Sequence, residues 1–328
     1  MIANKKYLVY VLFIFFLLVN VSIDVNAEDE KKTLYVDDDG TQQYTQINDA
    51  LKNATSGDTI FVYNGIYNGY FSIDKSITLL GESNEGTIID GNYNLTINSL
   101  INIKSDEVTI KNFKIINSEK IIPIENNLSL PFWYYDSGIG ILIESDNNII
   151  QDNNISSNGG YGILFNNSQN NLISFNYFSN QIENACIYFK NSSNNTIYGN
   201  VFENNIKGIV FQINSLDNLL YYNNFINNTE YHAYTESRNN FYDTTLKKGN
   251  YWDDYQGKDK NQDGVGDNEY KVKGNVSADK YPLTFPYQKP EKLIIDDNQL
   301  VTMLAIGMVI TILVFLPIGY YWRKKYFS

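Results

Sequence analysis

Oxygen-bearing side chains alternate along one short segment in the last third of the chain. The five predicted ligands are Asp259, Asn261, Asp263, the carbonyl of Val265, and Asp267. Gly264 falls at the tight turn, and hard oxygen donors at this spacing suit Ca²⁺ better than a transition metal. Position twelve holds Tyr270 instead of the bidentate Glu of an ordinary EF-hand, and no flanking helices are evident. We predict a structural Ca²⁺ loop that orders the end of the fold; the alternative is a solvated turn that binds nothing.

Cysteine and histidine, the other common sources of site chemistry, are almost absent. The chain has one Cys and one His, at Cys186 and His232. An intrachain disulfide, a Cys/His metal cluster and a Cys–His nucleophilic pair are therefore excluded. Cys186 lies within an apolar run, which is typical of an inert core residue.

The charge of the chain restricts its partners. Its 328 residues carry a net charge of −12, and several of the few basic residues lie at the two ends. Such a field repels nucleic acid and attracts cations. We therefore expect no nucleic-acid partner.

A regular repeat positions the central part of the chain. Four similar segments begin at Ser145, Ser168, Ser192 and Ser215, at spacings of 23, 24 and 23 residues. Each contains short apolar patches of three to five residues separated by Asn-rich bends. At about 3.3 Å per residue, three short strands with bends between them form one coil of a parallel β-helix.

Asparagine and proline usage supports this interpretation. A second Asn recurs with the same period at Asn153, Asn176, Asn200 and Asn223. Asn tolerates the left-handed backbone of a corner, and its amide can stack from coil to coil. No Pro occurs from 132 to 281, as expected where every strand must donate its N–H groups to a neighbour.

An insertion interrupts the repeat from Glu119 to Asp136. It contains two prolines and four consecutive aromatic residues, from Phe132 to Tyr135. Exposed rings beside a β-helical groove can form a sugar-stacking platform; alternatively, they pack the loop against the coil.

Carboxylates within the repeat offer no aligned catalytic pair. A hydrolase needs two carboxyl groups on one face, and a lyase needs carboxylates with an Arg or Lys base. The acids of the repeat are Glu144, Asp146, Asp152, Glu183, Glu203 and Asp217. Lys190 and Lys207 are available as bases, but nothing singles them out. We assign no catalytic residue and favour a non-enzymatic role.

The two ends predict export and membrane attachment. Residues 1–27 have the lysines, apolar run and small-residue ending of a signal peptide, although an uncleaved anchor is the alternative. Residues 300–321 form an uncharged segment long enough to span a bilayer. A basic tail at 322–328 follows it, so the tail is predicted to be cytoplasmic and the body, joined by a linker at 288–299, extracellular or periplasmic. Asn-x-Ser/Thr recurs in that body, which makes glycosylation possible in an exporting cell.

Several segments resemble the pectin-lyase-like, right-handed parallel β-helix proteins of the NosD type, in their archaeal cell-surface form. The matching segments are Leu34–Gly40, Gly57–Val62, Lys75–Gly81, Gly249–Tyr255 and Asp279–Leu283. The resemblance implies an all-β, right-handed parallel β-helix over 33–248 and a closing segment over 249–287. It also implies a helix at about 45–54 that caps the first coil.

The same resemblance implies copper handling during maturation of a copper enzyme. Copper prefers imidazole, thiolate or thioether ligands. The exported body offers His232 and Cys186, while Met303 and Met308 lie in the predicted span. The residues therefore do not support a copper cofactor.

The sequence as a whole predicts a membrane-anchored extracellular β-helix protein. Its expected role is that of a binding or structural module for polysaccharides or envelope proteins. One alternative is a carbohydrate-active enzyme, a polysaccharide lyase or glycoside hydrolase; another is a NosD-like maturation factor for a copper enzyme. The sequence leaves the ligand, the oligomeric state and glycosylation open.

Overall fold

The computed structural model describes residues 31–92, 98–119, 137–274 and 276–290. The predicted signal peptide (1–27), membrane span (300–321) and cytoplasmic tail (322–328) lie outside these residues, as does 120–136 of the aromatic-rich insertion. No helix in the described part of the chain has the length and hydropathy of a membrane span.

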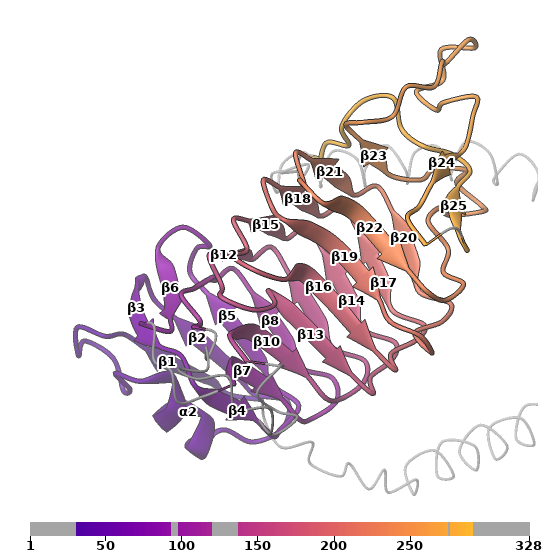
Figure 1. The fold of residues 1–328 in the computed structure, drawn as a ribbon. Coiled ribbons are helices and arrows are strands. Elements are labelled where there is room, and N and C mark those ends of the chain that lie inside the picture. Colours follow the sequence, from indigo (N-terminus) through magenta and orange to yellow (C-terminus); the bar gives the residue numbers. More distant parts are fainter. Residues whose placement is uncertain (1–30, 93–97, 120–136, 275, 291–328) are drawn as a thin grey trace, which may run out of the picture. The chain divides into compact units, whose positions relative to one another are not determined.

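Short strands pair in parallel to form three long sheets (Figure 1). Sheet A contains, in spatial order, β1 (Thr33–Val36), β2 (Thr59–Val62), β5 (Thr78–Gly81), β8 (Thr109–Lys111), β11 (Ile149–Gln151), β14 (Leu172–Ser174), β17 (Thr196–Tyr198) and β20 (Leu219–Tyr221). Sheet B contains β3 (Gly65–Asn68), β6 (Thr87–Asp90), β9 (Lys114–Ile116), β12 (Asn154–Ser156), β15 (Tyr177–Ser179), β18 (Val201–Glu203), β21 (Asn224–Ile226) and β23 (Tyr251–Trp252). Sheet C contains β4 (Phe71–Ile73), β7 (Ser99–Ile103), β10 (Ile139–Ile143), β13 (Ile163–Asn166), β16 (Ala185–Lys190), β19 (Lys207–Phe211) and β22 (Tyr231–Thr235).

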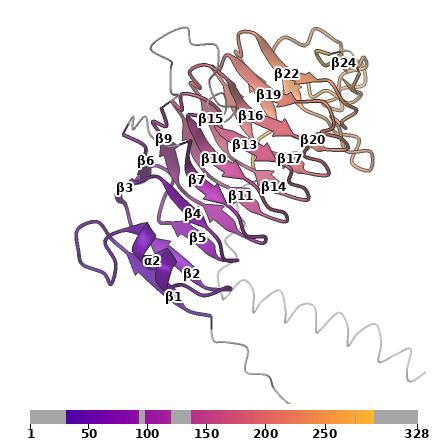
Figure 2. The same ribbon diagram turned by 60° about the horizontal axis from the view of Figure 1, so that its bottom comes forward.

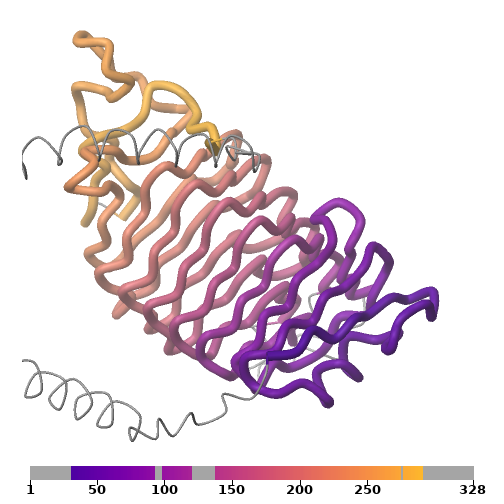
Figure 3. Tube along the Cα trace, turned by 180° about the vertical axis from the view of Figure 1, so that it is seen from behind, coloured from indigo at the N-terminus to yellow at the C-terminus, as the bar shows by residue number. Residues whose placement is uncertain are grey.

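Each full coil of the chain contributes one strand to each sheet, and Figure 3 shows the successive coils stacked along the fold. The register keeps equivalent residues in line: Ile150 pairs with Ile173, and Ile173 pairs with Ile197. All three side chains are fully buried. This confirms the parallel β-helix predicted from the repeat. Because β23 pairs with β21, sheet B continues past the predicted boundary at position 248.

Three corners of each central coil lie five residues apart. In one coil Asn147, Asp152 and Ser157 have φ values of 59°, 57° and 54°, and each precedes a buried amide. The buried amides form three ladders, one at each corner. The first comprises Asn148, Asn171, Asn195, Asn218 and Asn239; the second Asn153, Asn176, Asn200, Asn223 and Asn250; the third Asn158, Gln181, Asn205 and Asn228.

Each rung satisfies backbone groups that the corner would leave unpaired. Asn200 Oδ1 accepts hydrogen bonds from the backbone N–H (2.9 Å) and side-chain amide (3.1 Å) of Asn176. Its Nδ2 donates to the carbonyl of Ile173 (2.8 Å) and to Oδ1 of Asn223 (3.0 Å). Buried backbone groups at the bends thereby keep hydrogen-bond partners inside the core.

Aromatic rings stack along the interior next to the ladders. Phe202 stacks on Phe178 and on Phe225 with centroid distances of 4.9 Å in both cases. The column continues from Phe225 to Trp252 (4.4 Å) and from Trp252 to Tyr270 (4.2 Å). Tyr270 belongs to the segment that follows the last coil, so this column ties that segment to the core.

Short elements occupy the two ends of the stack. Figure 2 shows α2 (Ile47–Asn53) beside β1 and β2, where its residues Ile47, Ala50 and Leu51 are buried. At the other end β24 (Tyr270–Lys271) and β25 (Ala278–Asp279) form a small antiparallel pair. The chain as far as Tyr287 forms one compact unit with the coils.

Buried Asp279 continues the second ladder. Its Oδ2 accepts the backbone N–H of Asn250 (2.7 Å) and Nε1–H of Trp252 (3.0 Å), and its Oδ1 accepts the N–H of Tyr281 (2.9 Å). Burial raises the pKa of this carboxyl to about 7, although the donors favour its charged form. Both carboxyl oxygens face donors, but burial outweighs these hydrogen bonds and favours the protonated form below about pH 7.

Candidate functional site

The predicted calcium loop lies between β23 and β24. The Asp259 carboxylate accepts the backbone N–H groups of Asp263 (3.2 Å) and Gly264 (2.9 Å), while Asp267 Oδ2 accepts that of Lys260 (3.2 Å). Asn261 Nδ2 donates to Asp263 Oδ2 at 3.0 Å. The Val265 N–H donates to Asp263 Oδ1, and Gly264 has the positive φ of +81° expected at the turn.

The predicted ligands lie in one loop, but their carboxylate groups do not converge on one cation-sized space. Within the described ranges, the acids of this loop do not form a trio whose ligand atoms all lie within 4.8 Å of one another. The loop is held by carboxylate-to-backbone hydrogen bonds, and Ca²⁺ binding stays a prediction.

A different group does meet that distance: His232 on β22 with Asp253 and Asp254, which follow β23. His232 Nε2 lies 2.8 Å from Asp253 Oδ1 and 3.5 Å from Asp254 Oδ1. The imidazole is buried, whereas Asp254 is exposed. The three side chains line a pocket of about 400 Å³ together with Tyr270 and Lys273.

Sequence analysis did not bring this group together, since it treated His232 as an isolated residue. The only sequence signal is that His232 and Asp253 lie 21 residues apart, close to one repeat period.

Tyr270 O–H donates to Asp254 Oδ2 at 3.3 Å. Burial, and secondarily Asp254, raises the pKa of Tyr270, so its hydroxyl remains protonated.

A second candidate is a row of aromatic side chains at the outer corner between sheets A and B. We call it the aromatic strip: Phe175, Tyr198, Tyr221, Tyr222 and Tyr287. Tyr198 contacts Phe175 edge-on at 4.8 Å and stacks on Tyr221 at 5.3 Å. Tyr222 contacts Tyr221 at 5.6 Å and stacks on Tyr287 at 4.3 Å. All five side chains are half-buried, so ring edges reach the surface.

Two residues of the strip occupy strained backbone positions. Phe175 and Tyr222 have φ values of 56° and 58°, at the corner position that is Asp152 in one neighbouring coil and Gly199 in another. A left-handed conformation costs an L-residue about 1–2 kcal/mol, and bulky side chains adopt it rarely. Gly or Asn would occupy these positions with less strain. The presence of aromatic rings there indicates that the rings have a function at the surface.

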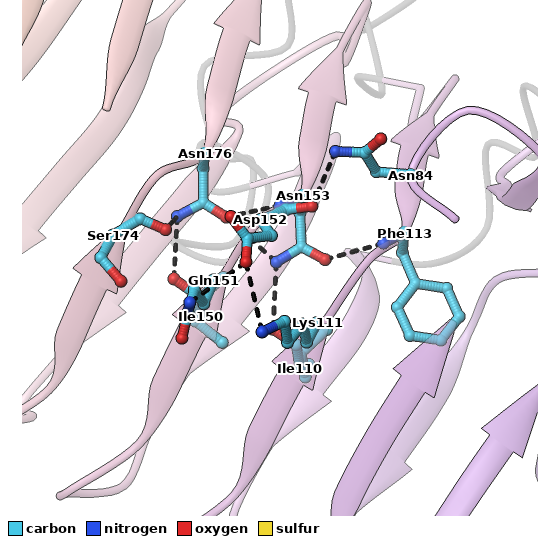
Figure 4. Close-up of polar contacts among 10 residues, drawn as sticks. All are labelled: Asn84, Ile110, Lys111, Phe113, Ile150, Gln151, Asp152, Asn153, Ser174 and Asn176. Carbon is cyan, nitrogen blue, oxygen red and sulfur yellow. Dashed lines mark hydrogen bonds and ion pairs between the residues drawn. The ribbon is translucent and has the colours of Figure 1, made fainter. Parts of the chain in front are cut away.

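Asp152 lies at the same corner, one coil before Phe175. Figure 4 shows its polar contacts with Lys111, Gln151 and Asn84. Its Oδ2 lies 3.3 Å from Lys111 Nζ and accepts Gln151 Nε2–H at 3.1 Å. Its backbone carbonyl accepts Asn84 Nδ2–H at 2.9 Å. The carboxylate also raises the pKa of Tyr198 as a smaller effect beside burial. Asp152 therefore forms a charged end to the aromatic strip.

Three other acids of the repeat have polar partners on the coils. Glu203 accepts the Tyr177 hydroxyl at 2.7 Å on sheet B. Asp146 accepts N–H groups from Gln169, and Asp217 lies 3.7 Å from Arg238. These contacts are surface hydrogen bonds and one ion pair.

The three stacked sheets with amide ladders at their corners define the chain as a parallel β-helix protein. The family described as "Periplasmic copper-binding protein (NosD)" matches residues 51–257, which include most of the coils and both Asp253 and Asp254. The chain belongs to the NosD family. No curated protein sequence gives a significant match.

Solved structures with similar coils are distant. A pectin methylesterase from Yersinia enterocolitica is 15% identical with a TM-score of 0.39, over 56% of this chain and 66% of that one. The Geobacillus virus E2 ORF18 protein is 16% identical with a TM-score of 0.46, over 67% and 48%. The periplasmic alginate epimerase AlgG is 19% identical with a TM-score of 0.39, over 62% and 42%. The chain thus spans two thirds or less of each.

Copper, named in the family's description, fits the described residues poorly. Cys186 is fully buried on β16, and burial raises the pKa of its thiol well above the usual value. The remaining ligand of a type that copper prefers is His232, because Met303 and Met308 lie outside the described residues. One imidazole with two carboxylates lacks the soft donors of a copper carrier.

Proposed function

We propose that this chain is a non-enzymatic β-helix protein, held at the outer face of the cell membrane, that binds neutral polysaccharide along the aromatic strip. The observation that carries the proposal is the placement of Phe175 and Tyr222 in left-handed corner positions. Asn or Gly would be more stable at these positions, so fold stability does not explain the aromatic rings. Contact with a ligand at the surface does explain them.

The chemistry of the strip suits a sugar chain. Aromatic rings pack against the C–H faces of sugars, and phenol hydroxyls exchange hydrogen bonds with sugar hydroxyls. Partial burial raises the pKa of Tyr198, Tyr221 and Tyr287, so these groups stay protonated and able to donate. Equivalent side chains repeat from coil to coil, which suits a ligand that itself repeats.

The charge of the chain selects among polysaccharides. Its net charge of −12 disfavours a polyanion. Lys111, which contacts Asp152 at the strip, is paired with that carboxylate. A neutral polymer avoids this electrostatic penalty, so the proposal commits to neutral glycans.

Affinity electrophoresis of the detergent-solubilised chain through gels containing neutral or acidic polysaccharides tests the proposal. We expect retardation by at least one neutral polymer and none by polygalacturonate or alginate. Tyr198→Ala and Tyr222→Ala should each weaken retardation several-fold, whereas Tyr234→Ala on the outer face of sheet C should not. Equal retardation of the wild type and all three variants would refute the proposal that the aromatic strip binds polysaccharide. Release of shorter oligosaccharides from the bound polymer would instead favour the enzyme alternative.

We further propose that Ca²⁺ binds the loop from Asp259 to Asp267 as a structural ion. The alternating oxygen side chains and the left-handed Gly264 support this. Asp263 is exposed, so its carboxylate is free to exchange a backbone partner for a cation. An ion there stabilises the end of the coils by binding only the folded state.

A further inference from the structure

We infer that the third amide ladder fixes His232 in the tautomer that carries its proton on Nε2, which closes this imidazole to copper and other transition metals. The metal binding in the family's description therefore does not reside at this residue in this chain. The inference rests on which atoms of Asn228, the last rung, face which partners.

Backbone groups fix the orientation of the Asn228 amide. Its Oδ1 accepts both the backbone N–H (3.2 Å) and the side-chain Nδ2–H (3.0 Å) of Asn205. Its Nδ2 donates to the carbonyl of Phe202 at 2.9 Å. A flipped amide would set nitrogen against two donors and oxygen against a carbonyl, at the cost of three buried hydrogen bonds.

This orientation places Nδ2 of Asn228 3.1 Å from Nδ1 of His232. An amide nitrogen only donates, so Nδ1 must accept and cannot carry a proton. The single proton of the neutral imidazole then lies on Nε2, which faces Asp253 Oδ1 at 2.8 Å. Asp253 is in turn held by the backbone N–H of Asn227, which donates to its Oδ2 at 2.6 Å.

A metal at Nε2 needs that nitrogen's lone pair. The proton would have to move to Nδ1, where it would oppose the Asn228 amide hydrogens inside a buried site. Metal-binding histidines instead direct their second N–H at a carboxylate or carbonyl oxygen. The trio of His232, Asp253 and Asp254 thus has the spacing of a metal site, but its hydrogen bonds are those of a ladder terminus.

The same logic predicts a substitution that would create a site. In Asn228→Asp, a carboxylate oxygen replaces the nitrogen that faces Nδ1. That oxygen accepts a proton on Nδ1, so the Nε2 lone pair becomes free and points towards Asp253 and Asp254. The other oxygen still accepts from Asn205, while the Phe202 carbonyl loses its donor.

The chain has a single histidine, so its imidazole can be read without assignment. Long-range ¹H–¹⁵N NMR of the full chain with ¹⁵N-labelled histidine, in detergent at neutral pH, should show a protonated Nε2 and an unprotonated Nδ1. In titrations with Cu²⁺ and Zn²⁺, wild type and His232→Ala should have the same affinity. Asn228→Asp should bind Zn²⁺ at least tenfold more tightly than wild type.

Two results would overturn the inference. One is a wild-type imidazole with its proton on Nδ1. The other is Cu²⁺ or Zn²⁺ binding that is lost in His232→Ala but present in wild type. Both are measured on the wild-type fold or on a truncation to Ala, so they decide the question even where Asn228→Asp does not fold.

Discussion

Replacing Asn200 by alanine should destabilise the β-helix by about 4 kcal/mol, because this fully buried amide joins three successive coils. Its Oδ1 accepts two N–H groups of Asn176. Its Nδ2 lies within 2.8–3.1 Å of three acceptors, on Ile173, Tyr198 and Asn223. Two hydrogens serve these three acceptors, so four full hydrogen bonds are lost, at about 1 kcal/mol each.

Urea unfolding of the detergent-solubilised chain, followed by far-ultraviolet circular dichroism, measures this difference. Asn204→Gly is the matched control: Asn204 is exposed and has a φ of 57°, which glycine adopts without strain. We expect that control to change the free energy of unfolding by less than about 1 kcal/mol. The denaturant slope must match wild type for the comparison to hold, since stacked repeats can unfold in stages.

A third variant separates hydrogen bonding from cavity formation. In Asn200→Asp an oxygen replaces the donor nitrogen and faces three acceptors inside the core. This variant should therefore be less stable than Asn200→Ala at neutral pH, although it leaves no cavity. If Asn200→Asp were as stable as wild type, or if Asn200→Ala matched the Asn204→Gly control, the ladder would not hold the coils together as argued.

Four further outcomes are expected. Burial raises the pKa of Asp279 to about 7 from 3.8, so its protonated form stabilises the fold at pH 4. This stabilisation, on the order of 4 kcal/mol, is lost as pH rises through 7. Asp279→Asn should flatten this pH dependence of the unfolding free energy. Phe175→Asn should keep the melting temperature within a few degrees, because relief of the left-handed strain offsets the lost ring contact, yet abolish most polysaccharide retardation. Millimolar Ca²⁺ should raise the melting temperature of wild type but not of Asp263→Ala, and no shift in wild type would remove the calcium proposal. Cys186 should resist thiol reagents in the folded chain and react only after unfolding; rapid labelling of the native chain would contradict its burial.

Much of the fold was predictable because the residues that stabilise it, the buried Asn side chains and the apolar patches, repeat along the sequence. The spacing of Asn153, Asn176 and Asn200 indicated the second ladder, and the apolar patches between them indicated the strands. The third ladder was not predicted. It includes Gln181 in place of one Asn, so a single residue type does not mark its spacing along the sequence.

The candidate sites were less predictable, since they depend on residues distant in sequence. The aromatic strip joins rings from three successive coils to Tyr287, which returns to the corner 65 residues after Tyr222. Composition alone shows an excess of Tyr but gives no reason to group these particular rings. The predicted calcium loop is a local pattern whose proposed ligands are only two residues apart, and its calcium binding stays a prediction.

The sequence by itself determined that the chain coils, because a period of 23 to 24 residues with Asn at the bends allows one parallel strand to stack on the next. It also determined that Cys and His, two side chains that bind transition metals, occur only once each. Only the tertiary structure decided that Phe175 and Tyr222 project from strained corners and that His232 ends a ladder with its Nδ1 facing an amide donor. Both depend on the orientation of side chains between neighbouring coils, which spacing along one chain does not specify.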